Sequence, residues 1–301
     1  MIIVKNRIIF FCITGALVIA SLVSVAVFGL KYSTDFTGGV LAEFSYASRP
    51  ASADLSQALD KAGIKGYSLR EAGEKDYILR SPVLTPAQRD ALPQTLSLDG
   101  KSPVTISQYT EVGPTIGTEL RRKALLAMSL VLLCILLFIA FAFRKVSQPV
   151  SSWVYGLIAL VTLLHDVIIP VGFFALLGHF VGAEVDTLFV TAVLTVLGFS
   201  IHDTIVVFDR VRENLAINKE RGKKEPFEET AGRALNQTFV RSINTSLTVL
   251  FTLLVLYFIG PASTEYFALT LLVGIIAGTY SSIALATPLL VVAERYLAKR
   301  K

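Results

Sequence analysis

Two aspartates lie inside hydrophobic segments that are long enough to cross a membrane. Asp166 belongs to the segment 150–180, and Asp203 belongs to the segment 187–208. An ionised carboxylate at the centre of a bilayer costs about 2.5–3.5 kcal/mol on insertion scales, so it requires a partner, a proton or a function. Acidic residues at this depth are typical of ion pathways and proton relays, and these two are therefore the first candidates for chemistry.

A basic partner for Asp203 is predicted on a later segment. Polar residues recur there at the spacing of one helical face, at Gln237, Arg241, Thr245 and Thr248, with Asn244 beside them. Arg241 begins this stripe from the cytoplasmic side, and an opposite charge nearby stabilises a buried carboxylate. We therefore expect Asp203 and Arg241 to face each other.

Two further residues are candidates for proton handling. The side chain of His202 projects from the helix about 100° away from that of Asp203, and histidine is the residue type that ordinarily changes charge near physiological pH, so His202 is a possible gate. Pro170 removes the hydrogen bond to the carbonyl of Asp166 and tends to kink the helix there. Asp166 is expected either to relay the proton or to hold this bend, as a buried acid bonded to a neighbouring hydroxyl.

The composition indicates an integral membrane protein. Of the 301 residues, 53% are hydrophobic and 17% are charged, against about 25% charged in soluble domains. Six segments have the length and hydropathy of a membrane span: 8–30, 124–143, 150–180, 187–208, 242–260 and 266–293. The first is too long for the apolar core of a signal peptide, and we interpret it as an uncleaved anchor.

Lysine and arginine cluster in alternate connections, which predicts the orientation in the membrane. They precede the first segment, follow the second at Arg144 and Lys145, fill the connection 210–240 and end the chain at Lys301. Both termini and this connection are therefore expected in the cytoplasm. The same asymmetry explains the net charge of +5, so nucleic acid is not an expected partner.

The segment 31–122 separates the first membrane helix (1–30) from the other five (123–301) and is predicted to be a small external, periplasmic α+β domain. Strands are expected at 40–46, 67–70, 76–80 and 104–109, and helices at 52–62 and 85–93. The order β-α-β-β-α-β is that of the ferredoxin-like fold. Balanced charge and apolar strands predict that this segment folds alone.

Local signals mark the ends of these elements. Ser52 and Thr85 are expected to cap the two helices, and Pro93 is expected to limit the second. The motif Asp35-Phe36-Thr37-Gly38-Gly39 follows the first membrane segment, and its glycines suit a tight turn with positive φ. Nothing in the domain gathers His, Cys or paired carboxylates at catalytic spacing, so no cofactor is expected.

Longer stretches match a known family: DFTGG at 35–39, LLHD at 163–166, GFSIHDTIVVFDRVRE at 198–213, NQTFVRSINTS at 236–246 and the glycine-rich last segment. On these motifs the chain resembles the SecD/SecF family of the bacterial protein-export machinery, within the resistance-nodulation-division superfamily. The resemblance covers nearly the whole chain. The segment 198–213 is its most specific part.

The resemblance implies six transmembrane helices and one external domain in the bacterial inner membrane. It also implies a complex with SecD beside the SecYEG channel and YajC, which uses the proton-motive force to draw unfolded polypeptide outward without being an enzyme. By position, the family's membrane carboxylate corresponds to Asp203, its essential arginine to Arg241, and a second carboxylate to Asp166. His202 stands where the family usually has asparagine.

Three other functions compete with protein export at this point. A half-pump for small molecules, from the same superfamily, would generally use a larger external domain. An intramembrane aspartyl protease would use Asp166 and Asp203 together, but neither has the glycine-flanked setting of those enzymes. A metal transporter would use His165–Asp166 and His202–Asp203, yet adjacent residues on a helix diverge, so each pair offers one ligand.

Overall fold

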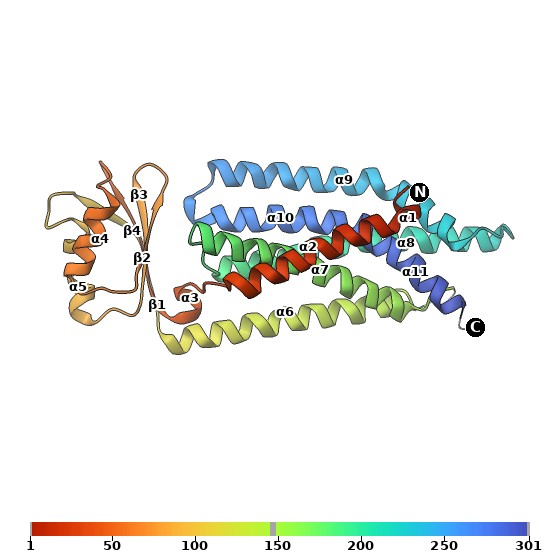
Figure 1. Cartoon of the computed structure of the whole chain (residues 1–301), viewed down its shortest axis with the longest axis horizontal. Coiled ribbons are helices and arrows are strands. Elements are labelled where there is room, and N and C mark those ends of the chain that lie inside the picture. The colour runs from red at the N-terminus through yellow and green to blue at the C-terminus, as the bar shows by residue number, and fades with distance from the viewer. Residues whose placement is uncertain (1, 145–148, 300–301) are drawn as a thin grey trace. The chain divides into compact units, whose positions relative to one another are not determined.

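The computed structural model describes residues 2–144 and 149–299, so Lys145 and Lys301, which helped to predict the orientation, lie outside the described residues. The chain divides into two compact units. The helical unit comprises Met1–Leu30, Ala127–Ala183 and Leu188–Lys301, and the sheet unit comprises Lys31–Leu126 and Glu184–Thr187. Figure 1 traces the chain through both units.

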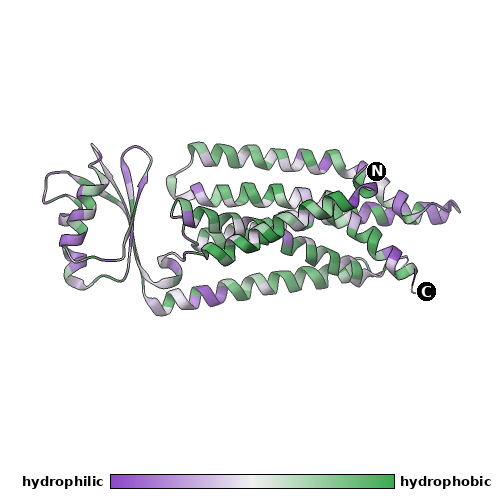
Figure 2. Cartoon of the chain, viewed as in Figure 1, coloured by the Kyte–Doolittle hydropathy of each residue, from purple (hydrophilic) through white to green (hydrophobic). Residues whose placement is uncertain are grey.

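Six helices in the described ranges are long and apolar enough to cross a membrane, which confirms the predicted six-span bundle. They are α2 (Arg7–Phe28), α6 (Pro114–Ala142), α7 (Ser152–Phe180), α8 (Thr187–Glu220), α9 (Phe227–Ile259) and a composite of α10 (Glu265–Ser281), the π-helix η2 (Ser282–Ala286) and α11 (Thr287–Ala298). The short elements α1 (Ile2–Lys5) and η1 (Ala262–Thr264) precede α2 and α10. Figure 2 shows the apolar residues that run along these helices.

The segment 210–240, expected as a connection between two membrane helices, is largely helical. Helix α8 continues to Glu220, and α9 begins at Phe227. The turn between them is held by a buried polar contact, in which the Asn218 amide donates a hydrogen bond to the Glu225 carboxylate at 2.7 Å. The two helices therefore extend well beyond the apolar stretches that define the spans.

The sheet unit is an antiparallel sheet with two helices. A short helix, α3 (Thr34–Thr37), precedes β1 (Gly39–Tyr46), α4 (Ser52–Lys61), β2 (Ser68–Ala72), β3 (Asp76–Ser81), α5 (Pro86–Leu96) and β4 (Val104–Val112). The strands lie in the order β2-β3-β1-β4, with Val40 opposite Ser81 on β3 and Gly39 opposite Val112 on β4. The predicted succession of strands and helices is confirmed, and Phe44, Leu59 and Leu79 are fully buried in one core.

Two details of the predicted helices are wrong. Helix α4 begins after Ala51, which offers no side-chain cap, so Ser52 is its first residue and not its cap. Helix α5 has the predicted cap at Thr85 but continues through Pro93 to Leu96. A proline removes one backbone donor, but Leu96 is fully buried in the core, and its packing keeps the last turn helical.

Small residues allow α10 to lie directly against α8. A Cβ atom on Gly274 would lie 2.3 Å from the Val196 side chain, and one on Gly278 would lie 2.8 Å from the Ser200 Cβ. Both distances are shorter than a normal carbon contact, so only glycine fits at these two positions. Glycines four residues apart are known to permit this close approach in membrane helices.

Candidate ion-coupling site

Asp203 lies on the buried face of α8. It is 3% exposed, and Ser242 of the neighbouring helix α9 is 1% exposed. In the part of the chain that the structure describes, Oδ2 of Asp203 and Oγ of Ser242 have no hydrogen-bond partner in good geometry, although the Ser242 hydroxyl lies near enough to act on the carboxylate. Most buried polar atoms in proteins do have one. The unpaired Oδ2 therefore marks a carboxylate that can accept a proton.

The groups that act electrostatically on Asp203 come from two helices. His202 precedes it on α8, and Arg241 and Ser242 reach it from α9. The predicted ion pair with Arg241 is not formed, since no Asp203–Arg241 contact within 4.0 Å occurs among the described residues. The structure thus brings the sequence-predicted acid and base into one neighbourhood without joining them.

Arg241 and its polar stripe lie on a face of α9 that is largely exposed in this chain. Gln237, Arg241, Asn244 and Thr248 are exposed, and Thr245 is half-buried. The Thr245 hydroxyl donates to the Arg241 carbonyl at 2.9 Å and the Thr248 hydroxyl to the Asn244 carbonyl at 2.8 Å, so the threonines satisfy themselves within α9. Helix α8 covers the stripe in part: the Asn214 amide of α8 donates a hydrogen bond to the Gln237 side-chain oxygen at 3.0 Å, whereas Asn244 and Thr248 are exposed.

A small cavity lies beside Arg241, near the charged residues of α8. It has a volume of about 130 Å³ and is lined by side chains of both signs, including Asp209, Arg210 and Glu213. The Arg241 guanidinium therefore borders a polar space as well as the neighbourhood of Asp203. If α8 and α9 move, the Arg241 guanidinium can therefore act either on Asp203 or on the cavity acids Asp209 and Glu213.

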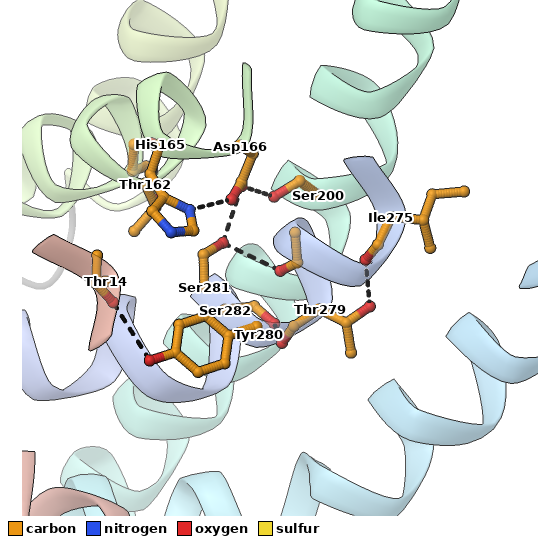
Figure 3. Close-up of polar contacts among 12 residues, drawn as sticks. Thr14, Thr162, His165, Asp166, Ser200, Ile275, Thr279, Tyr280, Ser281 and Ser282 are labelled. Carbon is orange, nitrogen blue, oxygen red and sulfur yellow. Dashed lines mark hydrogen bonds and ion pairs between the residues drawn. The ribbon is translucent and has the colours of Figure 1, made fainter. Parts of the chain in front are cut away.

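Asp166 has the hydrogen-bond partners that Asp203 lacks (Figure 3). It is fully buried on α7, and its Oδ1 lies 2.8 Å from Nδ1 of His165. Its Oδ2 accepts hydrogen bonds from the hydroxyl of Ser281 on α10, at 2.8 Å, and from that of Ser200 on α8. One carboxylate therefore joins three helices.

The sequence did not reveal these partners as a set. Adjacent side chains were expected to diverge, and for His165 and Asp166 that expectation is wrong, because the imidazole reaches the neighbouring carboxylate. Ser200 and Ser281 are distant in sequence, and nothing local indicates that they meet at Asp166. The bonds to hydroxyls agree with the simpler of the two predicted roles of Asp166, that of a buried acid bonded to neighbouring hydroxyls.

The network continues past His165 toward α2. The Tyr280 ring stacks on the imidazole with 6.2 Å between centroids, and its hydroxyl donates to the Phe10 carbonyl at 3.1 Å. The Thr14 hydroxyl of α2 donates to the same Tyr280 hydroxyl at 3.4 Å (Figure 3). Nε2 of His165 is buried and has no partner within the described ranges. The imidazole is thus the one member of the network with an unused polar atom.

Both acidic positions are tied to the same stretch of α8. Ser200, which binds Asp166, lies three residues before Asp203, or about 4.5 Å along the helix axis. The π-helix η2 starts directly after Ser281, and π-helical turns are frequent at functional sites. A change at either acid therefore acts on α8, next to an irregular part of the last membrane segment.

The motif at 35–39 is a structural junction. Gly38 and Gly39 have φ angles of 80° and 138°, which confirms the predicted turn with positive φ. A Cβ atom on Gly38 would lie 2.7 Å from the Pro114 Cα, and one on Gly39 would lie 2.2 Å from the Ser81 carbonyl oxygen. Both glycines are therefore required by close approach as well as by conformation.

Comparison with protein families gives one match that covers more than half of the chain. Residues 95–296 match the family described as "Protein export membrane protein SecD/SecF, C-terminal". The protein translocase subunit SecF of Thermobaculum terrenum is 41% identical over 300 residues, which covers 96% of this chain and 92% of the relative. That of Anaerolinea thermophila is 38% identical over 295 residues, covering 97% and 94%.

Longer relatives match over part of their length. The protein translocase subunit SecDF of Thermus thermophilus is 35% identical over 286 residues, which covers 92% of this chain but 36% of the relative. The crystal structure of SecDF from the same organism, described as a translocon-associated membrane protein, superposes with a TM-score of 0.83 at 31% identity. That match covers 97% of this chain and 38% of the SecDF chain, so the chain spans little more than a third of SecDF.

Proposed function

The chain belongs to the SecD/SecF family of protein export membrane proteins and takes part in protein translocation, and we propose that it does so by coupling translocation to the proton-motive force. In this proposal Asp203 takes up and releases the proton, and Arg241 stabilises its charged form. His202 modulates the exchange from the next position on α8. Asp166 acts through the hydroxyl network that it shares with α8, and no covalent chemistry is involved.

The unpaired, buried Oδ2 of Asp203 is the observation that carries this proposal. A buried carboxylate without a partner is costly when it is charged. The cost falls if the group takes a proton or meets a cation, and both His202 and Arg241 are close enough to act on it. Alternation between a protonated Asp203 and an Asp203 paired with Arg241 would convert a proton gradient into movement of α8 against α9.

We also propose that a SecD chain covers the outward face of α9. Arg241, Asn244 and Thr248 are exposed in this chain, whereas polar side chains at membrane depth usually face protein or a water-filled cavity. SecDF relatives carry a large additional part that could supply such a surface. The SecYEG channel, YajC and the unfolded polypeptide are further proposed partners, in line with the description of the structural relative as translocon-associated.

For the sheet unit we propose the ferredoxin-like fold and a periplasmic location. The element order β-α-β-β-α-β with the strand order β2-β3-β1-β4 supports the fold. The distribution of lysine and arginine supports an orientation in the inner membrane with both termini and the α8–α9 turn in the cytoplasm.

The competing functions gain no support from the site. An aspartyl protease requires two carboxylates that share one site, but the partners of Asp166 are His165, Ser200 and Ser281. A metal transporter requires a cluster of ligands, and the described residues contain no group of three His, Cys, Asp or Glu side chains that could hold a metal ion. The relatives that match over their whole length are translocase subunits.

Protein export into membrane vesicles, measured with and without an imposed proton gradient, tests the role of Asp203. Asp203→Asn keeps the size of the side chain but cannot ionise, so we expect the gradient-dependent part of export to be lost and assembly with SecD to be retained. Glu220→Gln removes an exposed acid from the end of the same helix and is expected to export like the parent. A full response to the gradient by the Asp203→Asn protein would contradict the proposal.

A further inference from the structure

The coupling site leaves the motif at 35–39 without a role, and the contacts of its aspartate point to α8. Oδ2 of Asp35 accepts hydrogen bonds from the backbone N–H of Thr187, at 3.0 Å, and from its hydroxyl, at 2.6 Å. Thr187 is the first residue of α8. The first turn of a helix has backbone N–H groups without helical partners, and it favours negative charge. Asp35 therefore binds the start of the helix that carries Asp203.

Further contacts hold the residues just before Thr187. The Ser33 N–H donates to the Val185 carbonyl at 2.9 Å, and the Val185 N–H donates to the Lys31 carbonyl at 2.7 Å. On the other side of the chain, the Glu184 carboxylate lies 3.6 Å from the Arg80 guanidinium of β3. These contacts explain why Glu184–Thr187 belong to the sheet unit and not to the helical unit.

The ion pair and the aspartate hold different parts of this attachment. Glu184 and Arg80 are 15% and 17% exposed at their side chains, and their contact holds the residues before α8. Burial raises the pKa of Glu184, and the attraction of Arg80 and Lys31 does not fully reverse the rise. Asp35 makes two hydrogen bonds to a single residue from a half-buried position. The aspartate is therefore the side chain that binds the first residue of α8 itself.

The chain on the other side of Asp35 is stiff. Between Ser33 and Gly38 the short helix α3 is closed by hydrogen bonds from the Thr37 N–H to the Ser33 carbonyl, at 3.1 Å, and from the Gly38 N–H to the Thr34 carbonyl, at 2.9 Å, and Gly39 then begins β1, which is paired on both sides. Helix α8 is continuous from Thr187 past Asp203, a distance of about 24 Å at 1.5 Å per residue. A displacement of α8 along its axis therefore reaches Asp35 without passing through a flexible connection.

We propose that Asp35 is a positioning residue that fixes the start of α8 to β1, so that movement of α8 caused by a change at Asp203 is passed to the sheet unit. This inference rests on the proposed coupling role of Asp203. It gives the 35–39 motif a mechanical task in translocation, in which the glycines permit the tight turn into β1 and the aspartate holds the helix.

The test compares three variants of the whole chain in vesicles that carry the complete export machinery. Asp35→Ala removes the acceptor, and Asp35→Asn keeps an acceptor oxygen at the same position. Thr85→Ala is the matched control, because it removes a side-chain cap from α5 in the same unit but leaves α8 untouched. Export with and without a proton gradient is measured together with amide hydrogen exchange.

We expect Asp35→Ala to raise exchange in the first turn of α8 about fivefold, the size of effect that loss of a helix cap produces. Gradient-dependent export should be lost while gradient-independent export stays at the parent level. Asp35→Asn should restore both properties. Thr85→Ala should raise exchange in α5 alone and export like the parent.

Undiminished gradient-dependent export in Asp35→Ala would overturn the inference. An equal loss in Thr85→Ala would also overturn it, because the loss would then report a weakened sheet unit.

If Asp35→Ala fails to assemble, Thr187→Ala removes only the hydroxyl donor and decides the question, with Thr187→Ser as its conservative counterpart. Asp203→Asn is measured alongside. If Asp203→Asn loses gradient-dependent export while Asp35→Ala keeps it in full, this inference alone is wrong. If Asp203→Asn keeps gradient-dependent export in full, the proposed function is wrong and the inference falls with it.

Discussion

Asp166 and Asp203 lie on adjacent helices of one bundle, but they differ in the number of hydrogen-bond donors around them. Asp166 accepts hydrogen bonds from the hydroxyls of Ser200 and Ser281, and its other oxygen contacts Nδ1 of His165. Oδ2 of Asp203 has no donor among the described residues. A carboxylate surrounded by donors from three helices is suited to holding them together. A carboxylate with one oxygen left unpaired, as in Asp203, is suited to changing its state.

Ser281→Ala tests the holding role of Asp166. The substitution removes one of the donors to a buried carboxylate, and hydrogen bonds to charged groups contribute about 1.5–3 kcal/mol. We expect the unfolding free energy to fall by that amount, seen as a lower midpoint of thermal unfolding in detergent. Ser282→Ala is the matched control, because the Ser282 hydroxyl donates only to the Thr279 carbonyl of its own helix. Equal losses for both variants would contradict the role assigned to Asp166.

The approach of α10 to α8 is what allows serines from two helices to reach the same carboxylate. Gly278 sets this distance, since a Cβ atom there would lie 2.8 Å from the Ser200 Cβ. Gly278→Ala must therefore push the helices apart, and overpacking of this kind costs about 1–3 kcal/mol. We expect a lower midpoint of thermal unfolding together with weaker gradient-dependent export.

Gly198→Ala is the control for this prediction. A Cβ atom at Gly198 of α8 would meet no atom within 4 Å, and alanine favours a helix over glycine by about 0.5–1 kcal/mol. The same chemical change is therefore expected to leave the midpoint unchanged or to raise it. A loss of similar size at Gly198 and Gly278 would show that helix contact is not the cause.

The sequence predicted the elements better than the contacts between them. Hydropathy and strand alternation are local properties, so the six spans and the order of the sheet unit could be predicted. Periodicity shows that Arg241 shares a face with other polar residues, but not which neighbour that face meets. The meeting of Ser200 with Ser281 depends on helix packing, which no local pattern encodes. At Pro93 the local pattern itself is misleading. Proline usually ends a helix, but the burial of Leu96 keeps α5 helical beyond it.

The whole molecule contains separate hydrophobic cores for its two units. The core of the sheet unit is built from strands and helices of that unit, including Val40, Phe44, Leu55 and Leu79, all 0% exposed. The residues Glu184–Thr187 are bound to the unit by hydrogen bonds and by the Glu184–Arg80 ion pair, and Val185 is itself buried.

The segment Lys31–Leu126 is therefore expected to fold by itself, as its balanced charge and apolar strands predict. Without Glu184–Thr187, the side chains of Asp35 and Arg80 lose partners that water can replace, so the loss of stability should be small. Cooperative thermal unfolding and dispersed NMR signals of the isolated segment are the measurements. Leu79→Ala removes a fully buried side chain, which costs about 2–5 kcal/mol, and should unfold the segment, whereas Lys65→Ala changes an exposed residue and should not. A molten or aggregated parent segment would show that its core depends on the membrane helices after all.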